Sequence, residues 1–420
     1  MQTTTPDISP ALLSEIRARF AHVDECPFQG PRIFFENAGG ALTLKSVVET
    51  STKFAAIPDN QGRDNPAAHA LVALIDKAKT DMAEFMNASH GQFFCGESGT
   101  ELLFRMIRTA CVNAPAGTKV IGSSIEHPAS RSAARRWAEI AGLDYVNVPH
   151  DDATGTVGAD AYKARLTPDI SVATILHTSP VTGIGVDVGG IAAAIRQIAP
   201  KAVIIVDGIQ HAAHGRIDID SYDIDGYAIS PYKVFSRHGF GIGWISDRMS
   251  AMPHDKLIGA PDTIWEFGTR DTGAYATMSD VVAYFDWLGA QVSDAQTRRD
   301  RIVAAGAAIH THEARLTDAM INGPGNLKGL KDMPHVRIIG GVENLAREGL
   351  VSIAVDGVPS PHVVKTLNQR GIRTHTRKAD HYSGNVLDPL GLEDAIRISL
   401  CHYNSEHEVA QLLAVLEDIA

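Results

Sequence analysis

The chain has 420 residues, with 38 basic and 49 acidic side chains and a formal net charge of −11. Hydrophobic residues make up 44% of the sequence and charged residues 21%, which is typical of a folded protein and too apolar for a disordered one. At about 100–200 residues per domain, this length predicts two or three domains, or one large core with a smaller one beside it. The acidic balance argues against a nucleic-acid partner and against binding to anionic membranes.

The four cysteines are isolated in the sequence, at Cys26, Cys95, Cys111 and Cys401. None belongs to a C-x-x-C pair, so neither a disulfide framework nor a zinc ribbon is indicated, and we expect no metal site. The first twenty residues lack the pattern of a secretory signal. The apolar runs, such as 202–206, are far shorter than the roughly 18 residues of a membrane span. These features predict a cytoplasmic protein.

Helices and apolar strands alternate in the first part of the chain. Ser9 and Pro10 are typical of a helix start, and a helical pattern returns at 68–86. Strands are predicted at 119–122, 172–176, 203–206 and 227–229, with helices at 130–141 and 190–198. Continuous apolar strands separated by helices predict an α/β fold, in which a mainly parallel sheet is covered on both faces.

The character of the sequence changes after about residue 290. A polar helix is expected at 291–320 and an amphipathic helix at 406–419. Short strands are expected at 336–339, 351–355 and 373–375. We therefore predict a large domain over 31–290, a smaller α+β domain over 291–420, and an N-terminal segment, 1–30, that packs on the smaller domain.

Two residues of opposite charge follow neighbouring predicted strands. Asp207 stands at the end of one buried strand, and Lys233 comes just after the next. The carboxyl ends of parallel strands share one edge of a sheet, so both side chains should reach the same crevice. An amine and a carboxylate there suit pyridoxal 5′-phosphate: the amine forms the internal aldimine, and the carboxylate keeps the pyridine nitrogen protonated. Taken singly, Asp207 would more often be a helix cap and Lys233 a surface charge, whereas the two together, in this order, favour the cofactor.

The motifs around these residues resemble those of class V aminotransferases, a fold-type I family that includes cysteine desulfurases and isopenicillin-N epimerase-like enzymes. The resemblance lies in V-D-G-x-Q at 206–210, in S-x-x-K at 230–233, and in the glycines Gly239 and Gly241. It extends from about residue 33 to the C-terminus. It implies a large domain with a mainly parallel seven-stranded sheet, a smaller α+β domain, and pyridoxal phosphate as the cofactor.

The resemblance also implies roles for individual residues. Lys233, His127 and Asp207 would be catalytic, with His127 stacked over the cofactor ring. The cofactor would be bound by Gly99, Thr100, His127, Asp207, Gln210, Ser230, Tyr232 and Lys233. Gly99 and Thr100 match the phosphate loop, and Gln210 matches a hydrogen-bond donor to the phenolic oxygen. Thr269, in an E-x-G-T segment, matches a residue that reaches the partner's phosphate, which implies a homodimer with shared active sites.

Substrate contacts are expected from a second set of residues. Arg397 matches the arginine that holds the substrate carboxylate, with a structural salt bridge as the alternative. Asn37, Arg237 and His375 are further candidates. The basic, histidine-rich segment that contains His375 and Arg377 could bind an acidic or polar substrate, with a solvated surface as the alternative.

The sequence departs from the family pattern in two places. Cysteine desulfurases of this group carry a nucleophilic cysteine in the loop before the substrate arginine, and the matching segment, 374–384, has none. Pro180 stands where the family often has an asparagine that contacts the ring.

Lyase-type, desulfurase-like cleavage of an amino acid or related amine through Lys233, without a persulfide cysteine, is therefore the leading hypothesis. An aminotransferase or epimerase is the alternative, and a catalytically silent binding protein is the non-enzyme alternative. A metal hydrolase is disfavoured because His211 and His214 form only an isolated pair.

Overall fold

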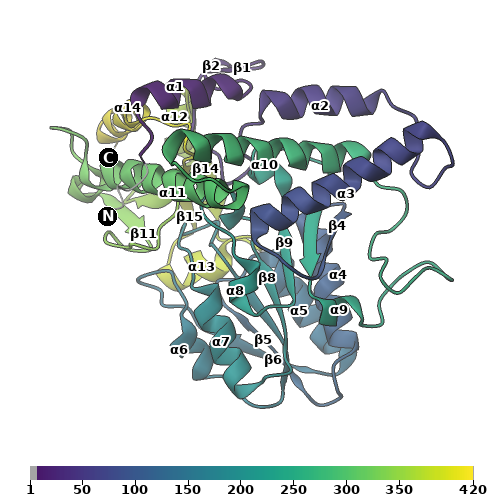
Figure 1. Cartoon of the computed structure of the whole chain (residues 1–420). Helices are drawn as coiled ribbons and strands as arrows, with labels where there is room; N and C mark the ends of the chain where they lie inside the picture. Colours follow the sequence, from purple (N-terminus) through teal and green to yellow (C-terminus); the bar gives the residue numbers. More distant parts are fainter. Residues whose placement is uncertain (1–6, 420) are drawn as a thin grey trace.

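A seven-stranded sheet forms the centre of the larger part of the molecule in the computed structural model, which describes residues 7–419 (Figure 1). The strand order is β4-β10-β9-β8-β7-β5-β6, and only β10 runs antiparallel to its neighbours in this sheet. The strands are β4 (Gln92–Gly96), β5 (Lys119–Ser123), β6 (Asp144–Val148), β7 (Ile170–Leu176), β8 (Val203–Asp207), β9 (Gly226–Ile229) and β10 (Gly241–Ile245). The mainly parallel seven-stranded sheet expected from the sequence is confirmed.

Side chains along the central strands alternate between two cores. In β5, Val120 packs into the core on one face and Ile121 into the core on the other, and both are fully buried. The first core is covered by α4 (Gly99–Val112) and α5 (Pro128–Ala141). The second is covered by α3 (Pro66–Met86), α7 (Val188–Ile198) and α10 (Thr272–Val292). Coverage on both faces explains why these strands are continuous apolar runs.

Three strands of this sheet gave no clear signal in the sequence. The edge strand β6 reads Asp-Tyr-Val-Asn-Val and is half exposed, so it lacks an apolar run. Strand β10 contains Gly241 and Gly243, and glycine is depleted in strands. Strand β4 is a short aromatic stretch that ends in Gly96.

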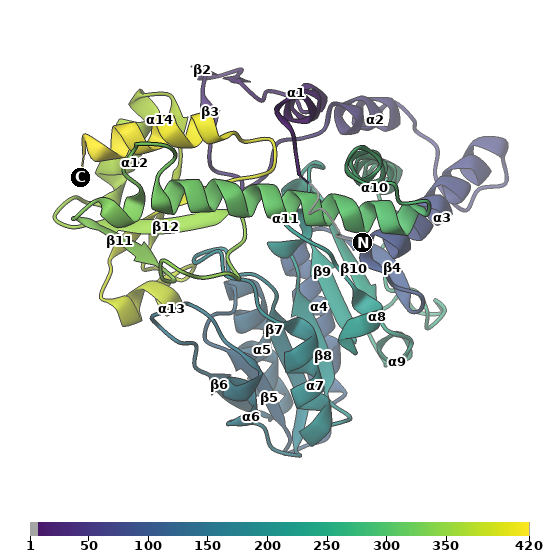
Figure 2. The same ribbon diagram turned by 60° about the vertical axis from the view of Figure 1, so that its left-hand side comes forward.

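The smaller part contains a four-stranded antiparallel sheet in the order β11-β12-β15-β14 (Figure 2). Its strands are β11 (Val336–Ile339), β12 (Leu350–Val355), β15 (Asp394–Ser399) and β14 (His375–Lys378). Helices α12 (Ser360–Gln369) and α14 (Glu406–Glu417) pack on it around a separate core. The strand expected at 373–375 is wrong: Thr374 separates β13 (Ile372–Arg373), which pairs with β3 (Ile33–Phe34), from β14.

The long helix α11 (Arg298–Asn322) connects the two parts. The helix expected at 291–320 is wrong at its start, because α10 ends at Val292 and α11 begins only at Arg298. The Thr297 side chain accepts a hydrogen bond from Asp300 N and so caps the new helix. Arg298 pairs with Asp81 of α3, whereas the far end of α11 enters the core of the smaller part.

The N-terminal helix α1 (Pro10–Arg19) contacts both parts of the chain. Ser9 caps it as expected, accepting a hydrogen bond from Leu12 N. Arg17 Nη1 donates to the carbonyl of Tyr403 at 2.6 Å. Phe20, just after the helix, packs edge-on against Phe235 with ring centroids 5.4 Å apart.

The other elements are short or peripheral. They are α2 (Lys45–Ala55), α6 (Ala159–Lys163), α8 (Ile219–Tyr222), α9 (Asp247–Ser250), α13 (Gly384–Leu387), β1 (Glu25–Cys26), β2 (Gly30–Pro31) and four 3₁₀ turns. Across residues 7–419, no helix combines the length and apolarity needed to cross a membrane.

Replacement of Gly241 should destabilise the fold, because this glycine packs against the start of α4, which forms part of the site described below. A Cβ at this position would lie 2.4 Å from the carbonyl carbon of Ser98 and 2.6 Å from Gly99 N, at the start of α4. Backbone cannot move aside as a side chain does, so Gly241→Ala should cost about 1–3 kcal/mol of unfolding free energy. Urea unfolding measures this loss. Gly158→Ala, with open space around its Cβ, is the matched control, and equal stability of the two variants would contradict the prediction.

Candidate active site

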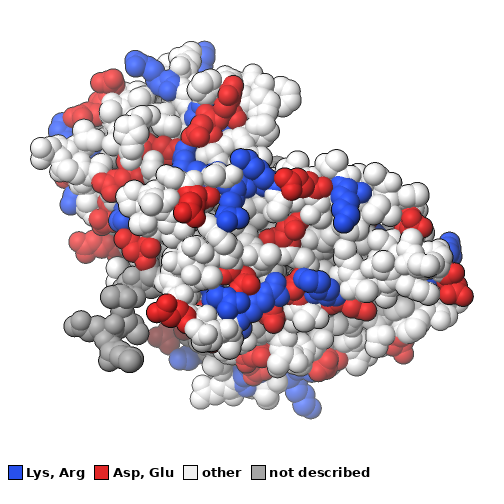
Figure 3. Space-filling view, turned by 45° about the horizontal axis from the view of Figure 1, so that its top comes forward, with Lys and Arg blue, Asp and Glu red and all other residues white. Residues whose placement is uncertain are grey.

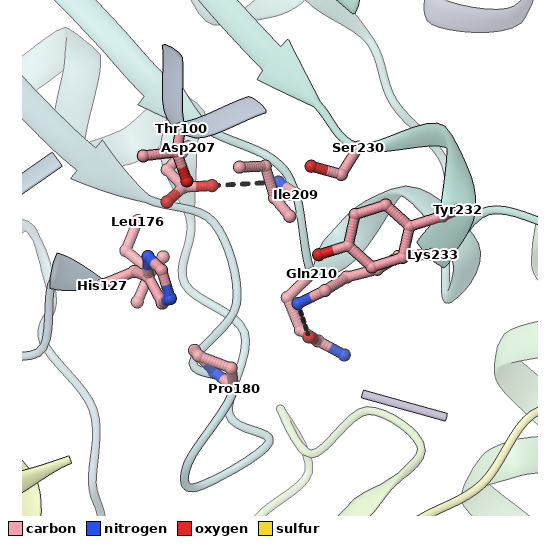
Figure 4. Close-up of a pocket in the computed structure, with 10 residues that line it drawn as sticks. All are labelled: Thr100, His127, Leu176, Pro180, Asp207, Ile209, Gln210, Ser230, Tyr232 and Lys233. Carbon is pink, nitrogen blue, oxygen red and sulfur yellow. Dashed lines mark hydrogen bonds between the residues drawn. The ribbon is translucent and has the colours of Figure 1, made fainter. Parts of the chain in front are cut away.

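A cavity opens at the carboxyl ends of β8 and β9 (Figure 4). It is lined by Thr100, His127, Leu176, Pro180, Asp207, Ile209, Gln210, Ser230, Tyr232 and Lys233. Seven of the residues expected from the sequence at the cofactor site line this one cavity, and they come from four separate segments of the chain.

Lys233 lies in a short 3₁₀ turn directly after β9, with its amine inside the cavity. Its Nζ donates a hydrogen bond to Gln210 Oε1 at 3.2 Å. Burial, together with the positive charges of Arg397 and Arg377, lowers the pKa of Lys233 to about 7, whereas Asp207 opposes the shift. The amine is therefore available in its neutral, nucleophilic form near neutral pH.

Asp207 is the last residue of β8. Its side chain lines the cavity on the side of Ile209 that is away from Lys233 (Figure 4). One of its oxygens accepts a hydrogen bond from Ile209 N at 3.1 Å. Burial raises the pKa of Asp207 to about 6, against the lowering effects of that hydrogen bond and of Lys233. A buried carboxylate with an oxygen left over is suited to a cationic N–H group in the cavity.

His127 caps α5, and its Nδ1 accepts a hydrogen bond from Ala129 N at 3.1 Å. Burial lowers the pKa of His127 to about 3, and the nearby charges of Lys233 and Arg377 act in the same direction. The ring is therefore neutral, and Nε2 carries its proton because Nδ1 is an acceptor. A neutral flat ring in this place is suited to packing on another aromatic ring.

One end of the cavity is built to accept an anion. Gly99 and Thr100 form the first turn of α4, where backbone N–H groups have no partner within the helix. A Cβ on Gly99 would lie 2.5 Å from both Ile209 Cδ1 and Ser230 Oγ, so only glycine lets the three segments meet. The hydroxyls of Ser230 and Tyr232 also line the cavity.

A chain of buried polar groups continues behind Lys233. Gln210 Nε2 lies 3.3 Å from His214 Nε2, and His214 Nδ1 lies 2.8 Å from Glu313 Oε2. Burial acts to lower the pKa of His214, but Glu313 outweighs it, so the pKa is raised. The sequence analysis missed this support for Gln210; the i, i+4 spacing of Gln210 and His214 is its only local sign.

His211 and Glu348 form a second buried pair next to this chain, 2.8 Å apart. The two histidines that looked isolated in the sequence therefore each have a carboxylate partner that is distant in the chain.

Arg397 extends from β15 towards the cavity and is fully buried. Its Nη1 donates to the carbonyl of Pro180, a lining residue, at 3.1 Å. Burial lowers the pKa of Arg397 to about 9, with a further contribution from Arg377. No carboxylate within residues 7–419 lies at ion-pair distance from it, so the structural salt bridge considered above is absent from this part of the chain.

Four other expected site residues do not line the cavity. The Asn37 amide is buried and bonded to the Ser399 carbonyl and to the Tyr403 hydroxyl. Arg237 is paired with Asp271. The remaining two are Thr269, which is exposed, and His375, which lies 3.3 Å from a carboxylate oxygen of Glu36.

Comparison with known proteins identifies the family. The profile of aminotransferase class-V matches residues 33–297 and 303–412, so the chain belongs to the class-V aminotransferase family. A probable cysteine desulfurase from Vibrio cholerae is 22% identical over 96% of this chain and 97% of its own. The cysteine desulfurase-like protein ustD from Aspergillus flavus is 26% identical over 93% and 88%, and the aminotransferase-like protein FGM3 from Gibberella zeae is 24% identical over 96% and 98%.

Solved structures agree on the fold. The cysteine desulfurase from Thermococcus onnurineus superposes with a TM-score of 0.78 at 20% identity, covering 92% of this chain and 94% of its own. The cysteine desulfurase CsdA from Escherichia coli gives a TM-score of 0.77 at 22% identity, covering 97% and 98%.

The family uses pyridoxal phosphate, and this is the cofactor of the chain. The cavity fits this group, because Gly99 leaves an open cradle of amides at one end and Asp207 and Lys233 offer a carboxylate and a neutral amine.

The low pKa of Lys233 predicts a measurable pH dependence. Acetylation of Lys233 by acetic anhydride in the cofactor-free protein should follow the neutral amine, with a midpoint near pH 7 instead of 10.5. Arg397→Gln removes a positive charge that disfavours protonation, so its midpoint should move upwards. Mass spectrometry of the Lys233 peptide gives both curves. Lys365→Gln, on the exposed side of α12, serves as the control, and a wild-type midpoint close to 10 would contradict the account.

Proposed function

We propose that the protein cleaves a carbon–heteroatom bond of an amino acid or a related amine, using pyridoxal phosphate attached to Lys233 and no persulfide cysteine. The observation that carries the proposal is the cavity in which a neutral Lys233 amine, the Asp207 carboxylate and the His127 ring converge (Figure 4). The similarity to proteins named as cysteine desulfurases supports cleavage at the carbon next to the α-carbon.

Each residue has a separate task in this proposal. Bound pyridoxal phosphate supplies an aldehyde carbon and an electron-accepting ring. Lys233 would hold that carbon through its Nζ and would move the α-proton of the substrate as a general base. Asp207 holds a proton at the ring nitrogen, and His127 packs on the ring face. Arg397 binds the α-carboxylate with its planar guanidinium.

The cysteines of the chain are poorly placed for a persulfide. Cys95, Cys111 and Cys401 are buried, and burial raises the pKa of all three thiols, that of Cys111 to about 12. Cys401 lies two residues after the end of β15. Cys26 lies in β1, and none of the four lines the cavity.

Replacement of the cysteines tests the absence of a thiol nucleophile. The four single Cys→Ser variants should each keep turnover within about threefold of the wild type, because a lost nucleophile would cost several orders of magnitude. Turnover is measured as release of keto acid with ammonia from the amino acid that reacts best. Cofactor absorbance and thermal melting report intact folding. Loss of turnover in one well-folded, cofactor-bound variant would contradict the mechanism.

The same assay separates the alternative reaction. Accumulation of the pyridoxamine form of the cofactor, without ammonia release, would favour an aminotransferase, as the name of the Gibberella zeae relative suggests. Racemised substrate recovered without net product would favour an epimerase.

We also propose a homodimer in which Thr269 completes the phosphate site of the partner subunit. Thr269 is exposed and remote from the cavity of its own chain, as this arrangement requires. Sedimentation should give a dimer, and Thr269→Ala should weaken cofactor binding without changing the sedimentation of the cofactor-free protein. Thr263→Ala, exposed in the same loop, is the control. A fully active monomer would overturn the proposal.

A further inference from the structure

We propose that the substrate is an amino acid whose side chain carries an anionic group, such as a carboxylate, and that Arg377 binds this group while Arg397 binds the α-carboxylate. The inference rests on the proposed amino-acid chemistry at Lys233 and names the substrate class of that site.

The register of the small sheet places both arginines on one face. Strands β14 and β15 are antiparallel, and His375 pairs directly with Arg397. Cross-strand partners share a face and so do alternate residues of one strand, so His375, Arg377 and Arg397 lie on the same side. Ser352, which pairs with Arg397 from β12, donates to the carbonyl of Val181, next to the cavity wall. This face of the sheet is therefore turned towards the cavity.

Hydrogen bonds from one edge of its guanidinium group hold the Arg377 side chain in place. Its Nε donates to Ser383 Oγ at 2.7 Å, and its Nη2 donates to the carbonyl of Tyr382 at 3.4 Å. Its guanidinium carbon lies 6.0 Å from the centroid of the Tyr382 ring, and that ring lies 6.3 Å from the ring of His127. Nη1 makes no hydrogen bond to any residue within 7–419, which leaves a positioned donor for a ligand.

Positive charge gathers here without a protein counter-ion. Neither Arg377 nor Arg397 has a carboxylate at ion-pair distance within residues 7–419, and the nearby Glu36 is already engaged by Arg373 at 2.7 Å and by His375 at 3.3 Å. On the face of the molecule shown in Figure 3, by contrast, acidic and basic side chains are interspersed. Arg397 is buried and Arg377 partly buried. An unpaired charge removed from water is costly, and a bound anion relieves that cost.

The position of the arginines assigns them to substrate and not to cofactor. Thr100 and Ser230, at the anion cradle, lie at one end of the cavity, and Pro180, which binds Arg397, lies at the other (Figure 4). In this proposal the cradle binds the cofactor phosphate, and one arginine binds the α-carboxylate of the substrate. A second anionic group is needed for the other.

Matched ligands test the proposal with the cofactor-bound protein. The change in visible absorbance gives apparent Kd values for two pairs of amino acids, L-aspartate with L-asparagine and L-glutamate with L-glutamine. Succinate and succinamate lack the amine, so their Kd values are measured by calorimetry. In at least one pair, the acid should bind roughly 10- to 100-fold more tightly than the amide, as expected of a charge-assisted hydrogen bond. Arg377→Gln should reduce that ratio to near one, and Arg377→Lys should restore part of it.

Lys378→Gln is the control, because Lys378 is the next residue of β14, is exposed and points to the opposite face. It should keep the wild-type ratio. Equal binding of acid and amide by the wild type would overturn the substrate class, and an unchanged ratio in folded Arg377→Gln would overturn the role of Arg377. If no amino acid changes the absorbance, the proposed function is overturned as well. This outcome therefore distinguishes a wrong substrate class from a wrong function.

Discussion

The chemistry of the site depends on the burial of the Lys233 amine. The amine is kept from water, and the negative charge of Asp207 compensates this burial only in part. The amine is buried, its hydrogen bond is to the neutral Gln210, and Asp207 is itself driven towards its neutral form by burial. Burial and the two arginines together move the pKa of the amine to about 7. A lysine in water would remain protonated at this pH and could not attack a carbonyl carbon.

The two parts of the chain supply opposite sides of this environment. The large sheet delivers Asp207 and Lys233 at the ends of neighbouring strands, and the start of α4 provides the anion cradle. The small sheet delivers Arg397 across the cavity, where it is bonded to Pro180 of the large part. Helix α11 spans both parts, with Arg298 paired to Asp81 at one end and Leu316 and Met320 in the core of the smaller part at the other.

Much of the fold and of the cavity could be predicted from the sequence because both depend on local patterns. Apolar runs marked the central strands, and the S-x-x-K and V-D-G-x-Q motifs brought Lys233, Asp207 and Gln210 to one edge. The edge strand β6 and the glycine-rich β10 were missed, since partners in the sheet and not their own residues stabilise them. The hydrogen bonds of Asn37 could not be predicted either, because its partners Ser399 and Tyr403 lie more than 360 residues away in the chain. The carboxylate partners of His211 and His214 were equally invisible.

The central claim is that Lys233 carries the cofactor, and borohydride reduction tests it most directly. The protein is saturated with pyridoxal phosphate, reduced, digested and mapped by mass spectrometry. The account predicts a single phosphopyridoxyl label, on Lys233, and none on that peptide when an amino-acid substrate has first displaced the lysine. A label on another lysine, with Lys233 unmodified, would contradict it.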